Sequence, residues 1–444
     1  VYKRQNWAIA KQWYSVGGNS KTAAPFRTLQ GFSTGAKSKM YDGCPGCPYK
    51  HYKQFYDYYG SFTYADDWAL AALDGTTLTF AAPAPGALSF NFGEAHDNAR
   101  KEAVKKGTAY MHVWMYAVRE FEDAIDDCKN CADGLNCKEL SDSFGPDSPQ
   151  YKAVHAWDEG VAFYAGSLEG PNVGGSSAGK MVYRLAEKRC ANFDTCESGS
   201  TGLSNVNKEL LADFILGEQY LMKGFCHAVR PIVDRIIKQM TVPLVQGTLR
   251  YAWKTGQIGG VDNKLADQTA KTSAEGSTFA AALLPMVHHC NPASATVVAD
   301  NIKFGLAFSP TDGSLPPLPT AGVGQQLPSF PAVKEALEKT YACLGITCDM
   351  VGSLGQVTSD GIVDASVGAK CTFASPPIAG YFPGSDVTQH NALDGDQKNM
   401  ESALAAGDFA AATTHYATGG SSTSKGSFRT MKGFSTGAKG KMYD

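Results

Sequence analysis

The 444-residue chain lacks several features that would assign it quickly to a class of protein. It has no hydrophobic run of about 18 residues, so the sequence predicts no membrane span. Charged residues make up 19% of the chain and the net charge is −3, which leaves no strongly basic surface for nucleic acid. Asn-x-Ser/Thr acceptors for N-glycosylation are absent, and strand-like alternation is sparse. The composition therefore predicts a globular, mostly helical protein that does not bind nucleic acid.

Cysteine, by contrast, is abundant. The chain has twelve, although its length allows a sizeable core without covalent support. Several are closely spaced beside loop-forming residues, and the paired CxxC…CxxC spacing of a zinc site is missing. We therefore predict disulfides and an extracellular or periplasmic location. The predicted disulfide residues are Cys44, Cys47, Cys128, Cys131, Cys137, Cys190, Cys196, Cys226, Cys290, Cys343, Cys348 and Cys371. Cys226 is a candidate partner of Cys290.

The end of the chain repeats a segment near its beginning. Phe26–Asp42 and Phe428–Asp444 are identical at 14 of 17 positions, at an offset of 402 residues. The agreement continues upstream, where Tyr14 corresponds to Tyr416. A repeat of this length predicts a tandem array of large domains, with further copies as partners.

This repeat gives the expected domain organisation. We expect residues 1–25 to be the tail of a preceding junction, with residues 1–5 non-native because they resemble a translated sequencing adapter. Residues 26–395 are the expected main domain. Residues 396–427 are expected to form a helical hairpin and a Gly/Ser linker, and residues 428–444 to begin the next copy.

Apolar residues recur three and four positions apart over much of the chain, which predicts a helical bundle with long disulfide-stapled loops. The expected helices are 94–127, 151–168, 180–192, 206–240, 244–254, 263–289 and 331–344. Pro231 is expected to kink a helix and Pro243 to separate two. The expected strands are 77–80 and 88–92.

A weaker internal repeat relates two of these helices. Glu159-Gly160 and Glu275-Gly276 recur at an offset of 116 residues, and five of ten surrounding positions match. This suggests a pseudo-twofold duplication of two helical halves, each contributing one glutamate.

The two glutamates are candidate metal ligands. A carboxylate on an otherwise apolar helix is costly unless it is paired or binds a cation. His155 precedes Glu159 by four residues, so both leave the same helix face, and carboxylate with imidazole suits iron. The metal candidates are Glu159, Glu275, His155, His112 and His227, and the candidate anion-binding residues are Arg119 and Arg235. The structural alternative is that both glutamates bond to helix ends or arginines, and that His112 lies on a solvated face.

One catalytic motif is considered and rejected. Gly175–Gly179 (GSSAG) matches a nucleophile elbow, which requires a preceding strand and a following helix. Here a loop precedes the motif, and its serines are typical of a helix N-cap. We therefore predict that the protein is not an enzyme.

Several longer motifs resemble a known family. These are YYGSFTYADDWALAAL, KGTAYMHVWMYAVREFEDAIDDC, WDEGVAFYAGSLEG and AEGSTFAAALLP, spread over roughly residues 31–306. They resemble the low-iron-inducible, iron-assimilating proteins of algae and other marine microbial eukaryotes, which are secreted to the periplasm or cell surface. The resemblance implies an iron-binding role in iron acquisition, with iron as the bound metal, but carries no set of ligands. The alternative is a structural or adhesive repeat protein that forms an extracellular filament or matrix.

Overall fold

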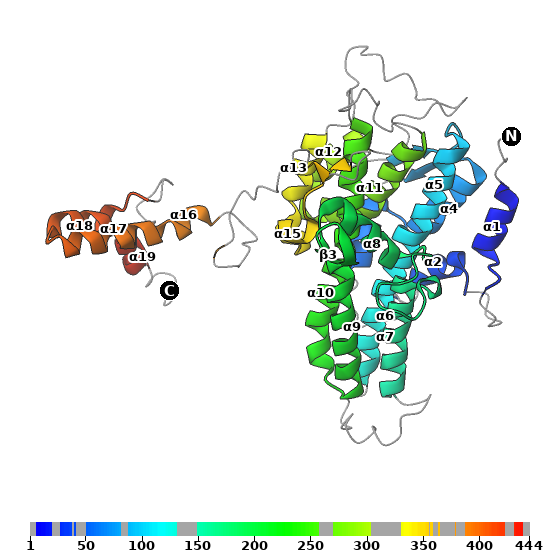
Figure 1. The fold of residues 1–444 in the computed structure, drawn as a ribbon, viewed down its shortest axis with the longest axis horizontal. Coiled ribbons are helices and arrows are strands. Elements are labelled where there is room, and N and C mark those ends of the chain that lie inside the picture. The colour runs from blue at the N-terminus through cyan, green and yellow to red at the C-terminus, as the bar shows by residue number, and fades with distance from the viewer. Residues whose placement is uncertain are drawn as a thin grey trace, which may run out of the picture. The chain divides into compact units, whose positions relative to one another are not determined.

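The computed structural model of the chain is shown in Figure 1. It describes residues 6–19, 27–37, 40, 50–80, 88–130, 149–256, 270–302, 330–354, 356–357, 363–364, 378, 387–421 and 430–437. The chain divides into two units, residues 1–372 and 373–444. Both are built mainly from helices, which confirms the predicted mostly-α fold.

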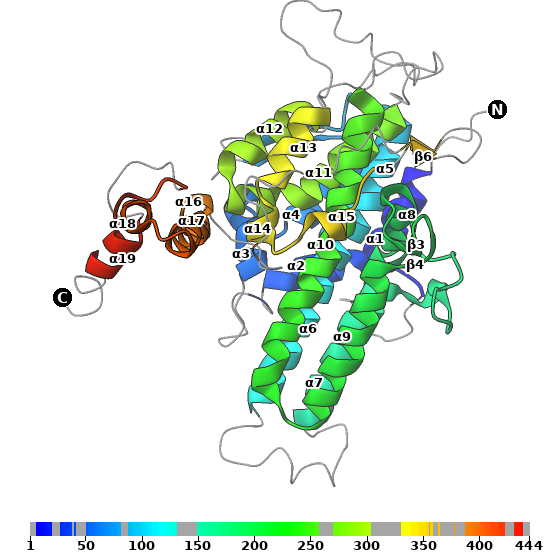
Figure 2. The same ribbon diagram turned by 60° about the vertical axis from the view of Figure 1, so that its left-hand side comes forward.

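Four long helices form a closed bundle in the first unit. They are α6 (Trp114–Asn130), α7 (Pro149–Ala165), α9 (Asn205–Met222) and α10 (Cys226–Gly256). Each packs on the next, α6 on α7, α7 on α9, α9 on α10 and α10 on α6, and they lie side by side in Figure 2. The ring of Phe121 lies 4.9 Å from that of Trp157 and 5.7 Å from that of Phe214. Burial of such side chains, at about 1.5–3 kcal/mol each, holds the bundle together.

The remaining helices of the first unit pack around α11 (Ala270–Cys290), which contacts α10, α5, α12 and α3. Their bounds are α3 (Lys50–Tyr59), α4 (Tyr64–Asp74), α5 (Asp97–Gly107), α8 (Val182–Phe193), α12 (Pro292–Ile302), α13 (Phe330–Glu338), α14 (Tyr341–Leu344) and α15 (Cys348–Val351). Two short helical turns, the π-helical η2 (Thr108–Val113) and the 3-10 turn η4 (Ser167–Glu169), follow α5 and α7.

The strands form short antiparallel hairpins. β1 (Thr77–Phe80) pairs with β2 (Leu88–Asn91), with Thr77 opposite Asn91 and Phe80 opposite Leu88, so both expected strands are confirmed. β3 (Cys196–Ser198) pairs with β4 (Thr201–Ser204), and β5 (Gln356–Val357) with β6 (Val363–Asp364). Sequence periodicity missed these two hairpins because two to four residues are too few to show alternation.

The expected single helix over 206–240 and the expected break at Pro243 are both wrong, because α9 ends at Met222 and α10 begins at Cys226. Residues 226–256 form one helix that passes through both Pro231 and Pro243. Met240, Val242, Leu244 and Val245 are fully buried around Pro243. The packing of this segment on all sides offsets the loss of one backbone hydrogen bond, a cost that would end an isolated helix.

Disulfides fasten the ends of the helices. Cys128 at the end of α6 pairs with Cys226 at the start of α10, Cys190 pairs with Cys196, and Cys290 pairs with Cys343. The candidate pairing of Cys290 with Cys226 is therefore wrong, since each lies next to a different partner in space. Cys348 is also disulfide-bonded. The other predicted disulfide residues, Cys44, Cys47, Cys131, Cys137 and Cys371, lie outside the described residues.

The glycines of the two Glu-Gly motifs serve helix packing. A Cβ on Gly160 would lie 2.7 Å from the Phe121 ring on α6, and one on Gly276 would lie 2.8 Å from Cβ of Tyr251 on α10. Each glycine therefore lets a helix approach its neighbour closely. The pseudo-twofold duplication itself remains a prediction.

Two N-terminal helices, α1 (Trp7–Ser15) and α2 (Leu29–Lys37), pack against α4 in the first unit. Tyr14 of α1 is buried in a cluster with Ala69 and Leu73, and Trp7 and Leu29 pack against it. The segment between α1 and α2 turns at Gly17 and Gly18, whose φ angles are +70° and +152°.

The second unit contains α16 (Thr388–Asn391), α17 (Leu393–Ala405), α18 (Phe409–Thr418) and α19 (Met431–Gly437). α17 packs against α18, and α18 against α19. The turn between α17 and α18 includes Gly407 at a φ of +73°. The expected domain boundaries at residues 26, 396 and 428 remain predictions.

Candidate functional site

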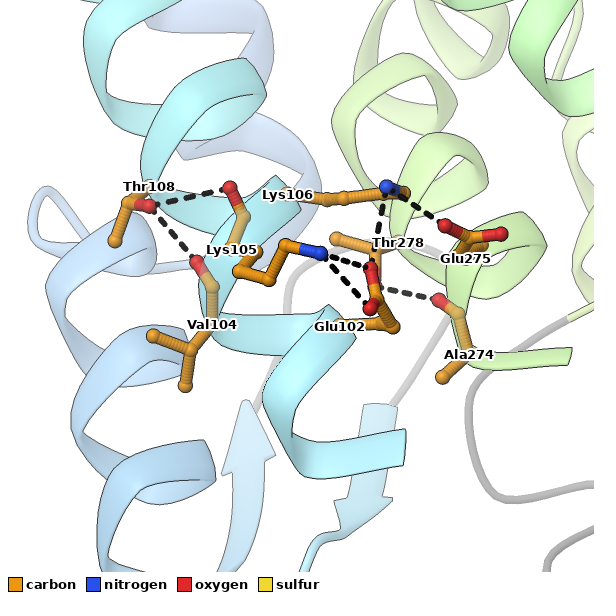
Figure 3. Close-up of polar contacts among 8 residues, drawn as sticks. All are labelled: Glu102, Val104, Lys105, Lys106, Thr108, Ala274, Glu275 and Thr278. Atoms are coloured by element: carbon orange, nitrogen blue, oxygen red, sulfur yellow. Dashed lines mark hydrogen bonds and ion pairs between the residues drawn. The ribbon is translucent and has the colours of Figure 1, made fainter. Parts of the chain in front are cut away.

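Glu275 lies in a buried charge cluster between α5 and α11. Nζ of Lys106 lies 2.9 Å from Glu275 Oε1 and 3.3 Å from Glu102 Oε2 (Figure 3). Lys105 donates to both oxygens of Glu102, at 2.9 and 3.1 Å. The Lys106 ammonium thus bridges two carboxylates. This arrangement matches the structural alternative expected for Glu275, except that the cation is a lysine and not an arginine.

The protonation of this cluster follows from the pairing. Burial alone would lower the pKa of Lys106, but Glu275, Tyr110 and Glu102 outweigh it and raise the pKa. Burial would raise the pKa of Glu275, but Lys106 and a hydrogen bond from Tyr251 hold it below the ordinary value. Both partners are charged at neutral pH, so a metal at Glu275 would have to displace Lys106.

Glu159 on α7 has a different environment. It is half-buried, Nε2 of the exposed His155 lies 3.4 Å from its Oε1, and a nitrogen of Arg27 lies 4.0 Å from the same oxygen. The helical spacing therefore places His155 and Glu159 together. Among the described side chains, the basic groups within 4.0 Å of this carboxylate are these two, His155 and Arg27.

The neighbouring helix α6 adds groups that the sequence patterns did not single out. Glu120 is buried and pairs with Arg119, which also bonds Asp123 at 2.8 Å. Burial raises the pKa of Glu120 to about 7, Arg119 opposes the shift, and Glu159 adds to it. Burial and the nearby Glu120 likewise raise the pKa of Tyr116, with Glu159 contributing. Glu120, Glu159 and Tyr116 therefore lie near enough for each carboxylate to disfavour the charged form of its neighbours.

Helix α2 covers part of this group. The ring of Phe32 lies 4.7 Å from that of Tyr116 and 4.9 Å from that of Phe163. Arg27, just before α2, supplies the cation nearest Glu159. We define the α6–α7 site as Tyr116, Glu120, His155 and Glu159. Tyr116 and Glu120 could have been found from their spacing, since a tyrosine and a glutamate four residues apart share a helix face.

His112 does not lie on a solvated face, so that expectation is wrong. It is buried on the π-helical turn η2, where the extra residue per turn rotates it inward. Its Nε2 lies 2.8 Å from the Tyr14 hydroxyl and its Nδ1 lies 3.2 Å from the Gly107 carbonyl oxygen. Burial lowers its pKa to about 4. It is a neutral partner in a buried polar network with Asp66, which accepts from Tyr14 at 2.6 Å.

The remaining candidates are His227, Arg235 and Arg119. His227 is exposed near the start of α10, and Arg235 pairs with Asp213 on α9 at 2.5 Å. Arg119, the other anion candidate, is engaged by Glu120 and Asp123. Within the described part of the chain, no group of three or more His, Cys, Asp or Glu side chains is arranged to hold a metal ion. The metal assignment therefore remains a prediction.

Comparison with protein families identifies the chain. The family model described as "Low iron-inducible periplasmic protein" matches residues 3–225, half of the chain. The chain belongs to the low iron-inducible periplasmic protein family. This confirms the resemblance found in the motifs and the extracellular or periplasmic location. Searches of curated proteins and of solved structures found no match.

Some of the candidate residues lie inside the segment that matches the low iron-inducible periplasmic family, and others lie beyond it. It covers α1 through α9, and so includes the whole α6–α7 site together with His112 and Arg119. Glu275, His227 and Arg235 lie beyond it. Among the described residues, no helix is both long and apolar enough to cross a membrane.

Proposed function

We propose that this protein binds iron outside the cytoplasm and assists iron acquisition as a binding protein rather than an enzyme. The observation that carries the proposal is the match to the low iron-inducible family over residues 3–225, a segment that contains the adjacent His155 and Glu159 of the α6–α7 site. Iron is the cargo of this function. Carboxylate, phenol and imidazole groups are the ligand types that the site offers to it.

Glu159 and Glu120 are the proposed carboxylate ligands. Glu120 is buried with a pKa raised to about 7, so its charged form lacks full compensation in the metal-free protein. A cation shared with Glu159 would provide that compensation, provided that binding draws the two carboxylates together, because the metal-free arrangement forms no metal-holding group with His155 among the described residues. Tyr116 is a further proposed ligand, and His155 lies at the exposed end of the group, 3.4 Å from Glu159.

Arg119 and Arg27 are suited to a second task. Arg119 bonds Glu120 and Asp123, and Arg27 lies 4.0 Å from Glu159. Two guanidinium groups beside a metal site can hold a small anion that completes the coordination of the metal. By contrast, Lys106 already neutralises Glu275, so we assign Glu275 to structural stability rather than to iron.

Iron titration of the purified chain tests this proposal. We expect Glu159→Gln and Glu120→Gln each to weaken iron binding at least tenfold, whereas Glu275→Gln and the exposed Glu209→Gln leave it unchanged. Circular dichroism of each variant shows whether the fold is kept. Failure of the wild-type chain to retain iron at micromolar free metal would refute the function, and equal retention by all variants would refute the site.

The proposed site also predicts the pH dependence of binding. Glu120 must lose its proton to bind a cation, and its pKa is about 7. Iron affinity should therefore fall as the pH drops through about 7, and the Glu120→Gln variant should lose most of this dependence. A profile that is flat in the wild type would contradict the role of Glu120.

A second candidate function is a structural or adhesive array of tandem domains. The observation that favours it is the 17-residue repeat at an offset of 402, which lies in both units. We propose that the tandem arrangement is compatible with either function. An array that serves iron uptake would bind one iron per copy, whereas a purely structural array would bind none.

A further inference from the structure

The helices α18 and α19 reproduce α1 and α2 in three dimensions. Asn6 Oδ1 accepts from the Ile9 amide at 3.1 Å at the start of α1. At the corresponding position, Asp408 Oδ1 accepts from the Ala411 amide at 2.9 Å at the start of α18. The same capping bond therefore begins both helices, although sequence identity is low over these helices.

The turn that follows is also the same. Gly17 and Gly18 have φ angles of +70° and +152°, and Gly419 and Gly420 have +66° and +157°. These values lie in regions that favour glycine, so the Gly-Gly pair fixes the path of the chain in both copies.

The second helix of each pair begins with the same cap. The Thr28 hydroxyl accepts from the Gly31 amide at 2.9 Å, and the Thr430 hydroxyl accepts from the Gly433 amide at 2.9 Å. A Cβ on Gly17 would lie 3.4 Å from the Thr28 methyl, and one on Gly419 would lie 3.6 Å from the Thr430 methyl. We call each helix pair with its turn a docking pair.

The corresponding aromatic side chains of the two docking pairs differ in their exposure to solvent. Tyr14 is 2% exposed, but its counterpart Tyr416 is 40% exposed. Phe434, the counterpart of Phe32, is 38% exposed, and Phe409, the counterpart of Trp7, is 71% exposed. The second pair thus displays the large side chains that the first pair uses to pack on its unit.

The first pair shows what such side chains bind. Tyr14 reaches Asp66 and His112, and Trp7 lies over the guanidinium of Arg100 at 4.1 Å. Phe32 packs on Tyr116 and Phe163. These contacts all fall on α4, α5, η2, α6 and α7, which we call the receiving face.

The second pair is held in shape by α17. Asp396 is fully buried and accepts from the Ser421 amide at 2.9 Å, just after the Gly-Gly turn. A Cβ on Gly419 would lie 2.7 Å from its other oxygen. The helix α17 therefore fixes the turn before any partner is bound, which reduces the entropy cost of docking.

We propose that α18 and α19 dock on the receiving face of a second copy of the first unit, which continues the chain after Asp444. Tyr416 takes the place of Tyr14 between Asp66 and His112 of that copy, and Phe434 takes the place of Phe32. The inference rests on the tandem part of the proposed function and not on iron binding.

The register of the repeat indicates that the binding partner of α18 and α19 is the next copy of the first unit. The receiving face of the described first unit is already filled by α1 and α2. Residues 438–444 (AKGKMYD) repeat residues 36–42 (AKSKMYD), which lead to α3 in the first unit. The same connecting sequence therefore follows both docking pairs. In the first unit, docking also places Phe32 of α2 against Tyr116 of the α6–α7 site.

An extended chain tests the proposal. Residues 43–372 are added after Asp444, which keeps the repeat register, and hydrogen exchange is measured on this chain and on the 444-residue chain. We expect α18 amides to be protected in the extended chain to the same degree as α1 amides, and to exchange at least tenfold faster in the 444-residue chain. Equal exchange of α18 in both chains, or an added unit that does not fold, would overturn the proposal.

Matched substitutions give a second readout. In the extended chain, Tyr416→Phe should lower the unfolding midpoint of the added unit as much as Tyr14→Phe lowers that of the first. An effect of Tyr14→Phe without one of Tyr416→Phe would overturn the proposal. Self-association of the 444-residue chain that Tyr416→Ala abolishes would assign the partner to a second molecule and overturn the tandem assignment. Iron is absent from all these measurements, so their failure is distinct from failure of the iron-binding function.

Discussion

The hydroxyl of Tyr14 lies 2.8 Å from Nε2 of His112, deep in the first unit. The same hydroxyl donates to Asp66 at 2.6 Å, and Nδ1 of His112 lies 3.2 Å from the carbonyl oxygen of Gly107. The three contacts need three hydrogens, because a carbonyl only accepts, whereas a tyrosine and a neutral histidine supply two. Protonation of Asp66, which would then donate to the Tyr14 hydroxyl, would supply the third hydrogen. Burial raises the pKa of Asp66 and lowers that of His112, so Asp66 is the side chain of this pair that burial favours for taking up this additional proton.

Removing the Tyr14 hydroxyl should destabilise the protein. Tyr14→Phe leaves Asp66 and His112 buried without this partner, which should cost about 1–3 kcal/mol in the free energy of unfolding. Urea denaturation measures the loss. Tyr416→Phe in the same 444-residue chain is the control and should have little effect, because Tyr416 is exposed. Equal losses in the two variants would contradict the role of the network.

The additional proton predicts a pH dependence. Burial raises the folded-state pKa of Asp66 above 3.8, so its contribution to stability is full below that pH and is lost as the pH rises through the folded pKa. His112 acts in the opposite direction. Its folded pKa of about 4 lies below 6.5, so its contribution is lost as the pH falls from 6.5 towards 4.

Asp66→Asn separates these two contributions. The asparagine amide can donate the hydrogen that a protonated Asp66 would donate. The variant should therefore still lose stability at acid pH, through His112, but should no longer lose stability as the pH rises. Urea denaturation from acid to mildly alkaline pH checks this. Parallel stability curves for wild type and variant would show that Asp66 does not carry the proton.

Lys106 should be more important for stability than either of its partners. Lys106→Met removes the only charge that bridges Glu102 and Glu275 in the described cluster, and should cost about 3–5 kcal/mol. Glu275→Gln should cost less, since Glu102 still pairs with Lys106. A double-mutant cycle by urea denaturation measures the coupling, and additive losses would show that Lys106 and Glu275 do not interact.

The glycine of the first Glu-Gly motif should not tolerate alanine. A Cβ at Gly160 would meet the Phe121 ring at 2.7 Å, so Gly160→Ala should cost about 1–3 kcal/mol through overpacking. Gly35 on α2 has nothing within 4 Å of such a Cβ. Gly35→Ala should therefore stabilise the protein by about 0.5–1 kcal/mol, the ordinary helix preference. Thermal unfolding compares the two, and equal midpoints would contradict the packing role of Gly160.

The sequence by itself determined the features that depend on local order along the chain. Helical periodicity located the helical segments, and alternation located the β1–β2 hairpin, because each pattern lies within one element. Periodicity did not locate the turn between α9 and α10, since apolar residues continue at helical spacing across it. The cysteines indicated an extracytoplasmic location, and the repeat predicted that Tyr416 corresponds to Tyr14. The pairing of His155 with Glu159 followed from a spacing of four on one helix.

Only the tertiary structure decided which side chains meet across elements. Lys106 of α5 reaches Glu275 of α11, and Phe32 of α2 packs on Tyr116 of α6, at separations in sequence that no local pattern encodes. His112 is buried because a π-helical turn changes the helix phase. The chain fixes the direction of each side chain locally, but its electrostatic partner and its exposure depend on packing against distant segments.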